Sequence, residues 1–199
     1  MRPHWLFLAL LLSGCRTAGI GEEAPADLGL AADLTTPPDL RRPLERSDPA
    51  TWGAAGNNPG DYVMEPDRMT LFEGAATGHI RSRSADAKGF ATWMSLRKPG
   101  ALLGQRVRMA GYVKAQGVVG WSGMWMRVDG VQSKTLAFDN MMNRPIKGTS
   151  GFTRYEIVLD VDAAAQAIYF GLILAGPGAV WIGGVTFEIV DQSVPTTGF

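Results

Sequence analysis

The sequence predicts an all-β domain, an antiparallel β-sandwich or barrel, between Trp52 and about Asp191. In many short segments of this region apolar residues alternate with polar ones, as in strands that bury one face and expose the other. Glycine, proline, asparagine and aspartate separate these segments, and such residues favour tight turns between strands. About 140 residues form one domain of ordinary size.

Ten segments have the pattern of strands. They are 61–65, 68–72, 76–83, 89–96, 105–116, 121–129, 134–139, 152–161, 166–174 and 179–190. RYEIVLDV is the clearest, because Tyr155, Ile157 and Leu159 share one face. In QRVRMAGYVKA, Val107 and Met109 lie opposite the basic residues. AIYFGLILAG is apolar on both faces, which predicts a central strand.

The first fifteen residues are typical of an export signal. MRPH is a short basic start, and WLFLALLL is an apolar run too short for a bilayer, which needs about 20 apolar residues. The ending LSGC resembles the lipobox of bacterial lipoproteins. This resemblance implies a signal peptide over 1–14 and a lipid on Cys15, and Arg16 after the cysteine implies the outer membrane. An ordinary signal peptide with an incidental cysteine is the alternative.

Residues 15–47 predict a flexible, disordered linker. Asp-Leu units recur at 27–28, 33–34 and 39–40, prolines are scattered among them, and no apolar stripe persists. Such a segment buries too little surface to offset its ordering entropy. A short amphipathic helix at 27–34 is the alternative, against which proline and glycine argue. We expect the sandwich domain over 48–192 and a C-terminal tail over 193–199.

The composition of the chain limits which partners and attachments the protein can have. Lysine plus arginine number 19, and aspartate plus glutamate also number 19, so the charge balance gives no footprint for nucleic acid. Cys15 is the only cysteine, so we expect no intramolecular disulfide. No later apolar run is long enough for a transmembrane helix, so we expect membrane attachment through the lipid alone.

The segment FTRYEIVLDVDAAAQAIYFGLILAGPGAVWIGGVTFEIV resembles the closing half of a jelly-roll sandwich of the carbohydrate-binding-module type, which is galactose-binding-like. This resemblance implies an antiparallel jelly-roll β-sandwich. Gly183 stands where that group often has aspartate, so the resemblance does not support that aspartate's role in metal binding or in the turn. The longer stretch from GYVKAQ to VLDV resembles an uncharacterised bacterial domain that occurs in exported proteins and is appended to regulators.

Catalytic signatures are missing from the sequence. GWSGM and GTSGF lack the second glycine of a nucleophile elbow, and His79 is the only histidine after the signal. Glu156, Asp160 and Asp162 fall on one strand face, where a solvated side is the simpler interpretation than a glycosidase pair. We therefore expect no enzyme, no cofactor and no metal, with an oxygen-ligand calcium site left open.

Surface recognition is the chemistry that the sequence favours. Trp121, Trp125 and Arg127 share one strand face, and a sugar site uses flat aromatic faces with polar groups at their rims. The alternative places Trp125 in the core, because most tryptophans are largely buried. Trp181 shares its side with Val185 in the alternating pattern and is predicted to lie in the core.

The loop AFDNMMNRPIKG supplies further candidates. If segment 134–139 pairs beside 121–129, this loop emerges near Arg127, and Asp139, Asn140 and Arg144 offer donors and acceptors at the rim of the sandwich. The alternative is that Asp and Asn only cap a turn.

These observations predict a lipid-anchored, non-catalytic binding module of the bacterial envelope, exported and attached to the outer membrane. The expected ligand is a carbohydrate or another polar molecule, bound by Trp121, Trp125, Arg127, Asp139, Asn140 and Arg144. The alternative is a structural lipoprotein that docks another envelope protein and has no small ligand; a hydrolase is a third and weaker interpretation. No nucleic-acid partner is expected.

Overall fold

The structure of the protein is a computed structural model that describes residues 45–199. The predicted signal peptide, Cys15 and most of the predicted linker lie outside the described residues. The strands are β1 (Glu45–Ser47), β2 (Gly53–Gly56), β3 (Tyr62–Phe72), β4 (Ala75–Ser82), β5 (Phe90–Arg97), β6 (Arg106–Asp129), β7 (Thr135–Asp139), β8 (Ile146–Asp160), β9 (Ala167–Ala175) and β10 (Ala179–Ile189). Four single-turn 3-10 helices connect them, at Pro49–Thr51, Pro59–Asp61, Gly100–Leu102 and Val131–Ser133.

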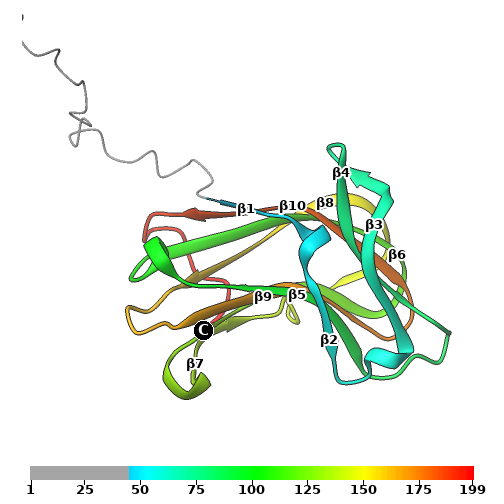
Figure 1. The fold of residues 1–199 in the computed structure, drawn as a ribbon, viewed down its shortest axis with the longest axis horizontal. Coiled ribbons are helices and arrows are strands. Elements are labelled where there is room, and N and C mark those ends of the chain that lie inside the picture. The colour runs from blue at the N-terminus through cyan, green and yellow to red at the C-terminus, as the bar shows by residue number, and fades with distance from the viewer. Residues whose placement is uncertain (1–44) are drawn as a thin grey trace, which may run out of the picture. The chain divides into compact units, whose positions relative to one another are not determined.

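These strands form two layers that face each other (Figure 1). The upper layer of Figure 1 has the order β3-β4-β10-β6-β8, with β1 paired to β10. The lower layer has the order β2-β5-β9-β6-β7. All pairings are antiparallel. The predicted all-β antiparallel sandwich is therefore confirmed, and β9 is a central strand as its apolar faces predicted.

Strand β6 belongs to both layers. Its first half pairs with β10 and β8, whereas residues 121–129 pair with β9 and β7. The sequence prediction divided it into two segments because glycines interrupt the alternation. The structure uses those glycines to turn the strand from one layer to the other: Gly117 has φ +58°, and a Cβ on Gly120 would lie 2.1 Å from the carbonyl oxygen of Ala175.

The core lies between the layers, and the predicted strand faces fill it. Val107 and Met109 from the first half of β6 are buried there, and Met124 and Met126 are buried from the second half. Trp93 of β5 also points inward, and its indole N–H donates to the carbonyl oxygen of Pro49 at 2.7 Å. Burying these side chains is the main source of stability for a domain in which the described residues contain no cysteine.

Trp181 is buried, but the prediction that it shares a face with Val185 is wrong. The register of β10 against β6 shifts between Gly183 and Thr186, and Gly184 has φ +61°. This β-bulge adds a residue and reverses the alternation. Trp181 therefore lies on the outer face of the upper layer, where its ring stacks on His79 with centroids 4.6 Å apart.

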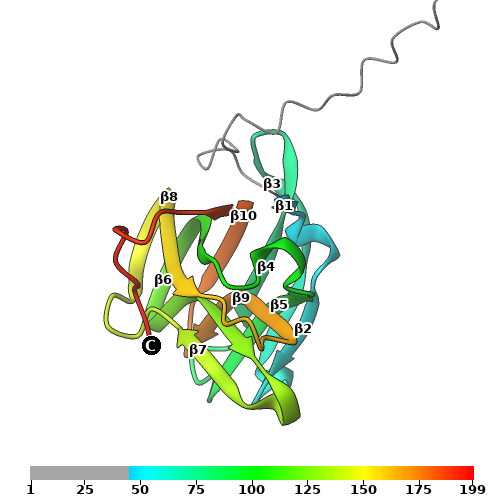
Figure 2. The ribbon, with the colours of Figure 1, turned by 90° about the vertical axis from the view of Figure 1, so that its left-hand side faces the viewer.

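Both ends of the described chain pack on the sandwich. Glu45 pairs with Phe187 in the register of β1 with β10, although the sequence prediction placed 45–47 at the end of the linker. At the other end, Figure 2 shows the C-terminal segment running from β10 past β8 towards β7. There the backbone of Phe199 exchanges hydrogen bonds with Phe138, at 2.7 and 3.3 Å. No helix in residues 45–199 is long and apolar enough to cross a membrane.

Candidate functional site

Trp125 and Arg127 lie together on the outer face of the lower layer, as their spacing predicted. Gly171 of β9 stands opposite Trp125 in the register of β6 with β9. The indole is only 7% exposed, however, and its N–H donates to the hydroxyl of Thr92 at 2.8 Å. Thr92 in turn donates to the carbonyl oxygen of Leu172 at 2.9 Å. Trp125 thus belongs to the outer face, yet little of its surface is accessible.

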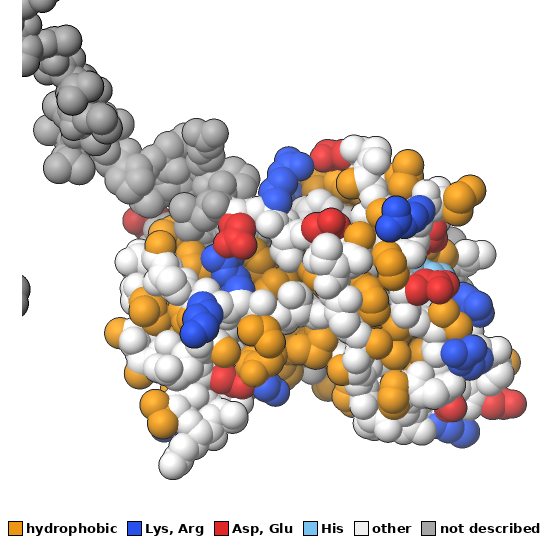
Figure 3. Space-filling model, viewed as in Figure 1, with side chains coloured by type: hydrophobic (Ala, Val, Ile, Leu, Met, Phe, Trp, Pro, Cys, Tyr) orange, Lys and Arg blue, Asp and Glu red, His pale blue; other side chains and the backbone are white. Residues whose placement is uncertain are grey.

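A groove of about 360 Å³ lies beside Trp125, and four of the side chains that line it are aromatic. We call it the groove. It is lined by Phe90, Thr92, Met94, Trp125, Arg127, Phe138, Tyr169 and Ile173, which come from β5, β6, β7 and β9. On the face that it displays, Figure 3 shows hydrophobic side chains gathered over β5 and β9, with basic and acidic side chains interspersed around them.

Arg127 forms the polar end of the groove. Its Nε and Nη2 donate to the two carboxylate oxygens of Asp129 at 2.9 and 2.8 Å, and its guanidinium lies 5.1 Å from the centroid of the Tyr169 ring. Trp121 is on the same face, opposite Ala175, and is partly exposed. It is not among the residues that line the groove.

The predicted loop residues bind one another. Arg144 donates to both carboxylate oxygens of Asp139, at 3.2 and 2.6 Å, and also to the carbonyl oxygen of Glu156 at 3.2 Å. Asp139 additionally accepts from the amide of Met141, and Asn140 accepts from the amide of Met142 at 3.1 Å. These bonds close the turn from β7 to β8, which is the capping role that the sequence analysis gave as the alternative. Their predicted role in ligand binding stays a prediction.

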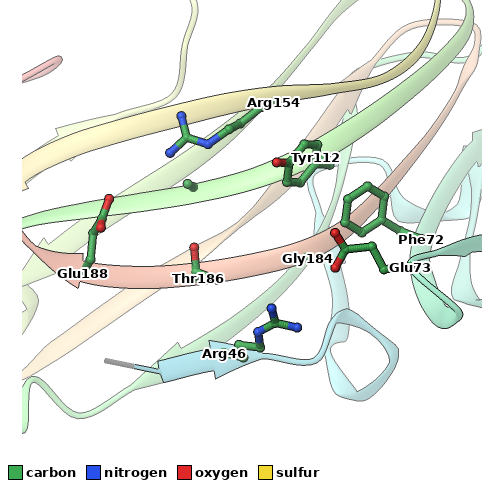
Figure 4. Close-up of a pocket in the computed structure, with 9 residues that line it drawn as sticks. Arg46, Phe72, Glu73, Tyr112, Arg154, Gly184, Thr186 and Glu188 are labelled. Carbon is green, nitrogen blue, oxygen red and sulfur yellow. The ribbon is translucent and has the colours of Figure 1, made fainter. Parts of the chain in front are cut away.

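A second hollow lies on the outer face of the upper layer, where the sequence analysis placed no site. We call it the cup, and its volume is about 250 Å³. Side chains from five strands surround it (Figure 4). It is lined by Arg46, Phe72, Glu73, Ala110, Tyr112, Arg154, Gly184, Thr186 and Glu188.

Aromatic rings form one wall of the cup. Phe72, at the end of β3, stacks on Tyr112 with centroids 4.5 Å apart, and it meets the ring of Phe152 edge-on at 5.1 Å. The two glycines of the β10 bulge make room for Phe72, because a Cβ on Gly183 or Gly184 would lie 2.6 Å from a Phe72 carbon. The glycine that replaces the expected aspartate at 183 therefore seats this ring.

Charged groups surround the rest of the cup. Arg108 donates to Glu188 at 2.7 Å, and Arg154 donates to Glu156 at 2.7 Å. Figure 4 shows Arg46 and Glu73 on the side of β1 and of the turn after β3. The charged lining residues are two arginines, Arg46 and Arg154, and two glutamates, Glu73 and Glu188, so the formal charges of the lining cancel.

The β3–β4 hairpin, which carries Phe72, is held down by Asp67. The Trp181 indole N–H donates to Asp67 at 2.7 Å, and the amides of Met69 and Thr70 donate at 2.7 and 3.0 Å. Burial raises the pKa of Asp67, but these hydrogen bonds outweigh it and hold the pKa at about 2. Burial lowers the pKa of the neighbouring His79, whose Nε2 has no hydrogen-bond partner in the described structure.

The sequence contained one signal for the cup. Tyr112 shares the polar face of its strand with Arg108 and Lys114, and tyrosine is enriched at binding interfaces. Phe72 and Arg46 carried no such signal, because tertiary packing brings them there from a hairpin and from the predicted linker. Within residues 45–199, no three His, Cys, Asp or Glu side chains are grouped to hold a metal ion.

Comparison with known proteins shows a similarity in sequence. No family model matches the chain. The uncharacterized HTH-type transcriptional regulator YbfP of Bacillus subtilis is 43% identical over 147 residues, which are 73% of this chain and 50% of the regulator. The chain thus spans about half the length of the curated relative that it matches.

Solved structures with a similar fold include carbohydrate-binding modules. The xylan-binding CBM22-1 domain from Paenibacillus barcinonensis has a TM-score of 0.51 at 10% identity, covering 76% of this chain and 96% of that one. A family 30 carbohydrate-binding module of a Clostridium thermocellum cellulosomal cellulase has a TM-score of 0.51 at 11% identity, covering 75% and 98%. The enzymatically active domain of bacteriophage CBA120 tailspike protein 4 has a TM-score of 0.54 at 10% identity, covering 72% of this chain and 20% of that one.

At these identities the likeness shows the fold alone. The chain has the β-sandwich fold of carbohydrate-binding modules, which agrees with the jelly-roll architecture that the sequence predicted.

Proposed function

We propose that this protein is an exported, lipid-anchored, non-catalytic module that binds a carbohydrate in the cup. The supporting observation is the composition of the cup: an aromatic wall of Phe72 and Tyr112, small floor residues, and opposed charged groups around them. A sugar ring has apolar C–H faces and many hydroxyls, so it needs both an aromatic surface and several hydrogen-bonding groups. The fold shared with carbohydrate-binding modules supports the same proposal.

The ligand that fits the cup best is a neutral sugar. The hydroxyls of Tyr112 and Thr186 and the carboxylates of Glu73 and Glu188 accept hydrogen bonds, while Arg46 and Arg154 donate them. Because the formal charges of the lining cancel, an acidic or basic sugar gains no net attraction there. The floor of Ala110, Gly184 and Thr186 leaves space for a ring against the sheet.

The relative in Bacillus subtilis supports the interpretation that this domain is a recognition domain used in more than one protein. Its name is that of a transcriptional regulator, and about half of its length matches this chain. A domain shared between an exported protein and a regulator is well suited to a soluble ligand, such as an oligosaccharide. Because one structural neighbour is named as xylan-binding, xylan-derived oligosaccharides are the first probes to use.

Non-catalytic binding is favoured over glycoside hydrolysis. A glycosidase pairs a carboxylate with a carboxylic acid that donates a proton. In the cup, Glu188 already accepts a hydrogen bond from Arg108 at 2.7 Å, so this carboxyl group is engaged by an arginine and does not face a second carboxyl group as its partner. We therefore expect that incubation with bound oligosaccharide releases no new reducing ends.

A glycan array, followed by calorimetric titration, tests the proposal. We expect Thr186→Arg to abolish binding, because a long side chain on the floor fills the cup. Thr153→Arg, at an exposed position of β8 outside the cup, is the matched control and should bind like the natural chain. Binding that survives in Thr186→Arg, or an array without any signal, would refute the cup as a carbohydrate site.

The alternative of docking to another envelope protein has less support. A flat methionine-rich patch around Met141 and Met142 would favour this alternative, because methionine side chains form adaptable contact surfaces. Met141 is only 1% exposed and belongs to the core, while Met142 is 61% exposed and lies outside that core. A flat methionine-rich patch is therefore not formed by this pair.

The lipid anchor is proposed from the sequence. We expect the natural chain to incorporate a labelled fatty acid and to fractionate with the outer membrane, whereas Cys15→Ser should do neither. Labelling that persists in Cys15→Ser would refute the anchor while leaving the carbohydrate proposal intact.

A further inference from the structure

The groove on the lower layer is built as a pocket of its own. Rings from different strands converge on it: Phe90 from β5, Phe138 from β7 and Tyr169 from β9. Trp125 forms part of its surface, fixed by the bond to Thr92. The Phe138 wall is held in turn by the backbone pairing with Phe199. The groove lies on the layer opposite to the cup, and the two share no lining residue.

The charge of the groove comes from one side chain. Among the described residues that line the groove, Arg127 is the one with a charged side chain. Its side chain is 40% exposed, whereas the side chain of its partner Asp129 is 4% exposed. The guanidinium is therefore accessible and the carboxylate is not. The hydrogen bonds to Asp129 use Nε and Nη2, so Nη1 retains donors for a ligand.

Of the other polar groups in the groove, the Thr92 hydroxyl and the Trp125 N–H are already engaged, which leaves the Tyr169 hydroxyl. The Thr92 hydroxyl accepts from Trp125 and donates to Leu172, so it has little capacity left. A sugar ring placed here would leave most of its hydroxyls without partners, at a cost for each. An aromatic ring has no such groups and packs favourably against Tyr169 and Phe138.

We infer that the groove is a second ligand site, which takes a planar aromatic ring carrying a carboxylate. The ring lies among Phe90, Phe138 and Tyr169, and the carboxylate accepts hydrogen bonds from Arg127. Charge-assisted bonds from a guanidinium to a carboxylate are stronger than neutral ones, so the acid should be preferred over its neutral amide.

Calorimetric titration of the full chain with three probes tests this inference. The probes are cinnamate, which has the ring and the acid; cinnamamide, which has the ring alone; and glucuronate, which has the acid on a sugar ring. We expect cinnamate to bind about tenfold more tightly than either of the others. Cinnamamide lacks the charge-assisted hydrogen bond to Arg127, and glucuronate lacks the packing of an aromatic ring. In Arg127→Gln, cinnamate and cinnamamide should bind equally.

Further variants keep the result decisive. Because Arg127→Gln leaves the buried Asp129 without its partner, the paired change Arg127→Gln with Asp129→Asn provides the same test in a neutral background. Ile173→Trp fills the groove from β9 and should abolish cinnamate binding. Thr186→Arg in the cup should leave cinnamate binding unchanged, which separates this site from the proposed carbohydrate site. No binding of cinnamate, equal binding of cinnamamide, or tighter binding of glucuronate would overturn the inference.

Discussion

Phe72 lies directly over Gly184, so that a Cβ on this glycine would come within 2.6 Å of the Phe72 ring. The two residues come from β3 and β10, which are not neighbours in the sheet. Their contact requires the bulge in β10, and it positions the ring that walls the cup. The geometry of the proposed carbohydrate site therefore depends on a backbone feature of β10, two strands away from β3.

Gly184→Ala should destabilise the fold and weaken the cup together. The φ of +61° disfavours any side chain, and the added methyl group displaces Phe72. We expect the free energy of unfolding in urea to fall by about 2 kcal/mol. Gly53→Ala is the control, since nothing lies within 4 Å of its Cβ position. Equal stability of the two variants would show that Phe72 moves aside without cost.

Arg144→Ala should destabilise the turn between β7 and β8. The side chain of Asp139 is 6% exposed, so removing the arginine leaves a buried carboxylate without its cation. We expect a loss of about 2 kcal/mol in the free energy of unfolding, reduced from the cost of a fully buried pair because Arg144 is partly exposed.

Adding Asp139→Asn to Arg144→Ala should recover much of that stability, because the amide still accepts from Met141 and carries no charge. Carbohydrate binding should be unchanged in both variants. A binding defect with normal stability would instead support the ligand role that the sequence analysis gave to this loop.

Much of this fold was predictable because alternation reports which strand face is buried. The faces of Val107 and Met109 in β6, and of Ile157 in β8, were assigned correctly from sequence spacing alone. The two faces of β10 were assigned incorrectly. A bulge at consecutive glycines reverses the alternation there, and the composition of the strand does not indicate it. Strand β1 was missed since it is short and polar, and only its pairing with β10 orders it.

The sites were less predictable than the strands. The position of Trp125 on an outer face follows from its alternation with Met124 and Met126, but its burial does not, since the residue is only 7% exposed. That its N–H would be occupied by Thr92, 33 residues away, is a tertiary contact that no local pattern carries. The cup was missed for the same reason, since Phe72 reaches it from a hairpin and Arg46 reaches it from β1.

Thr92→Val should show how much the hydrogen bond from the Trp125 indole to Thr92 contributes to the free energy of unfolding. The substitution keeps the shape of the side chain but leaves the buried indole N–H without an acceptor, which costs about 1–2 kcal/mol. Thr92→Ser retains the hydroxyl and is the matched control. We expect Thr92→Val to lower the free energy of unfolding in urea relative to Thr92→Ser. The reverse order would show that packing, and not the hydrogen bond, holds the ring.

The stability of the β3–β4 hairpin should depend on pH through Asp67. The pKa of this carboxyl is about 2 in the folded chain, against 3.8 as its ordinary value. A folded-state pKa below the unfolded value means that the carboxylate stabilises the fold above pH 4. This contribution disappears as the pH falls through the folded pKa near 2. Its full size is at most about 2 kcal/mol, since Asp67 is partly exposed.

We therefore expect Asp67→Asn to unfold at lower urea concentration than the natural chain at pH 7, and at nearly the same concentration at pH 2. His79 is present in both chains, so the comparison at each pH largely cancels its titration. Trp181 keeps an acceptor in the variant, because the asparagine carbonyl replaces one carboxylate oxygen. A difference between the two chains that stays constant from pH 7 to pH 2 would mean that the charge of Asp67 contributes nothing, and that packing and hydrogen bonds independent of this charge hold the hairpin over the cup.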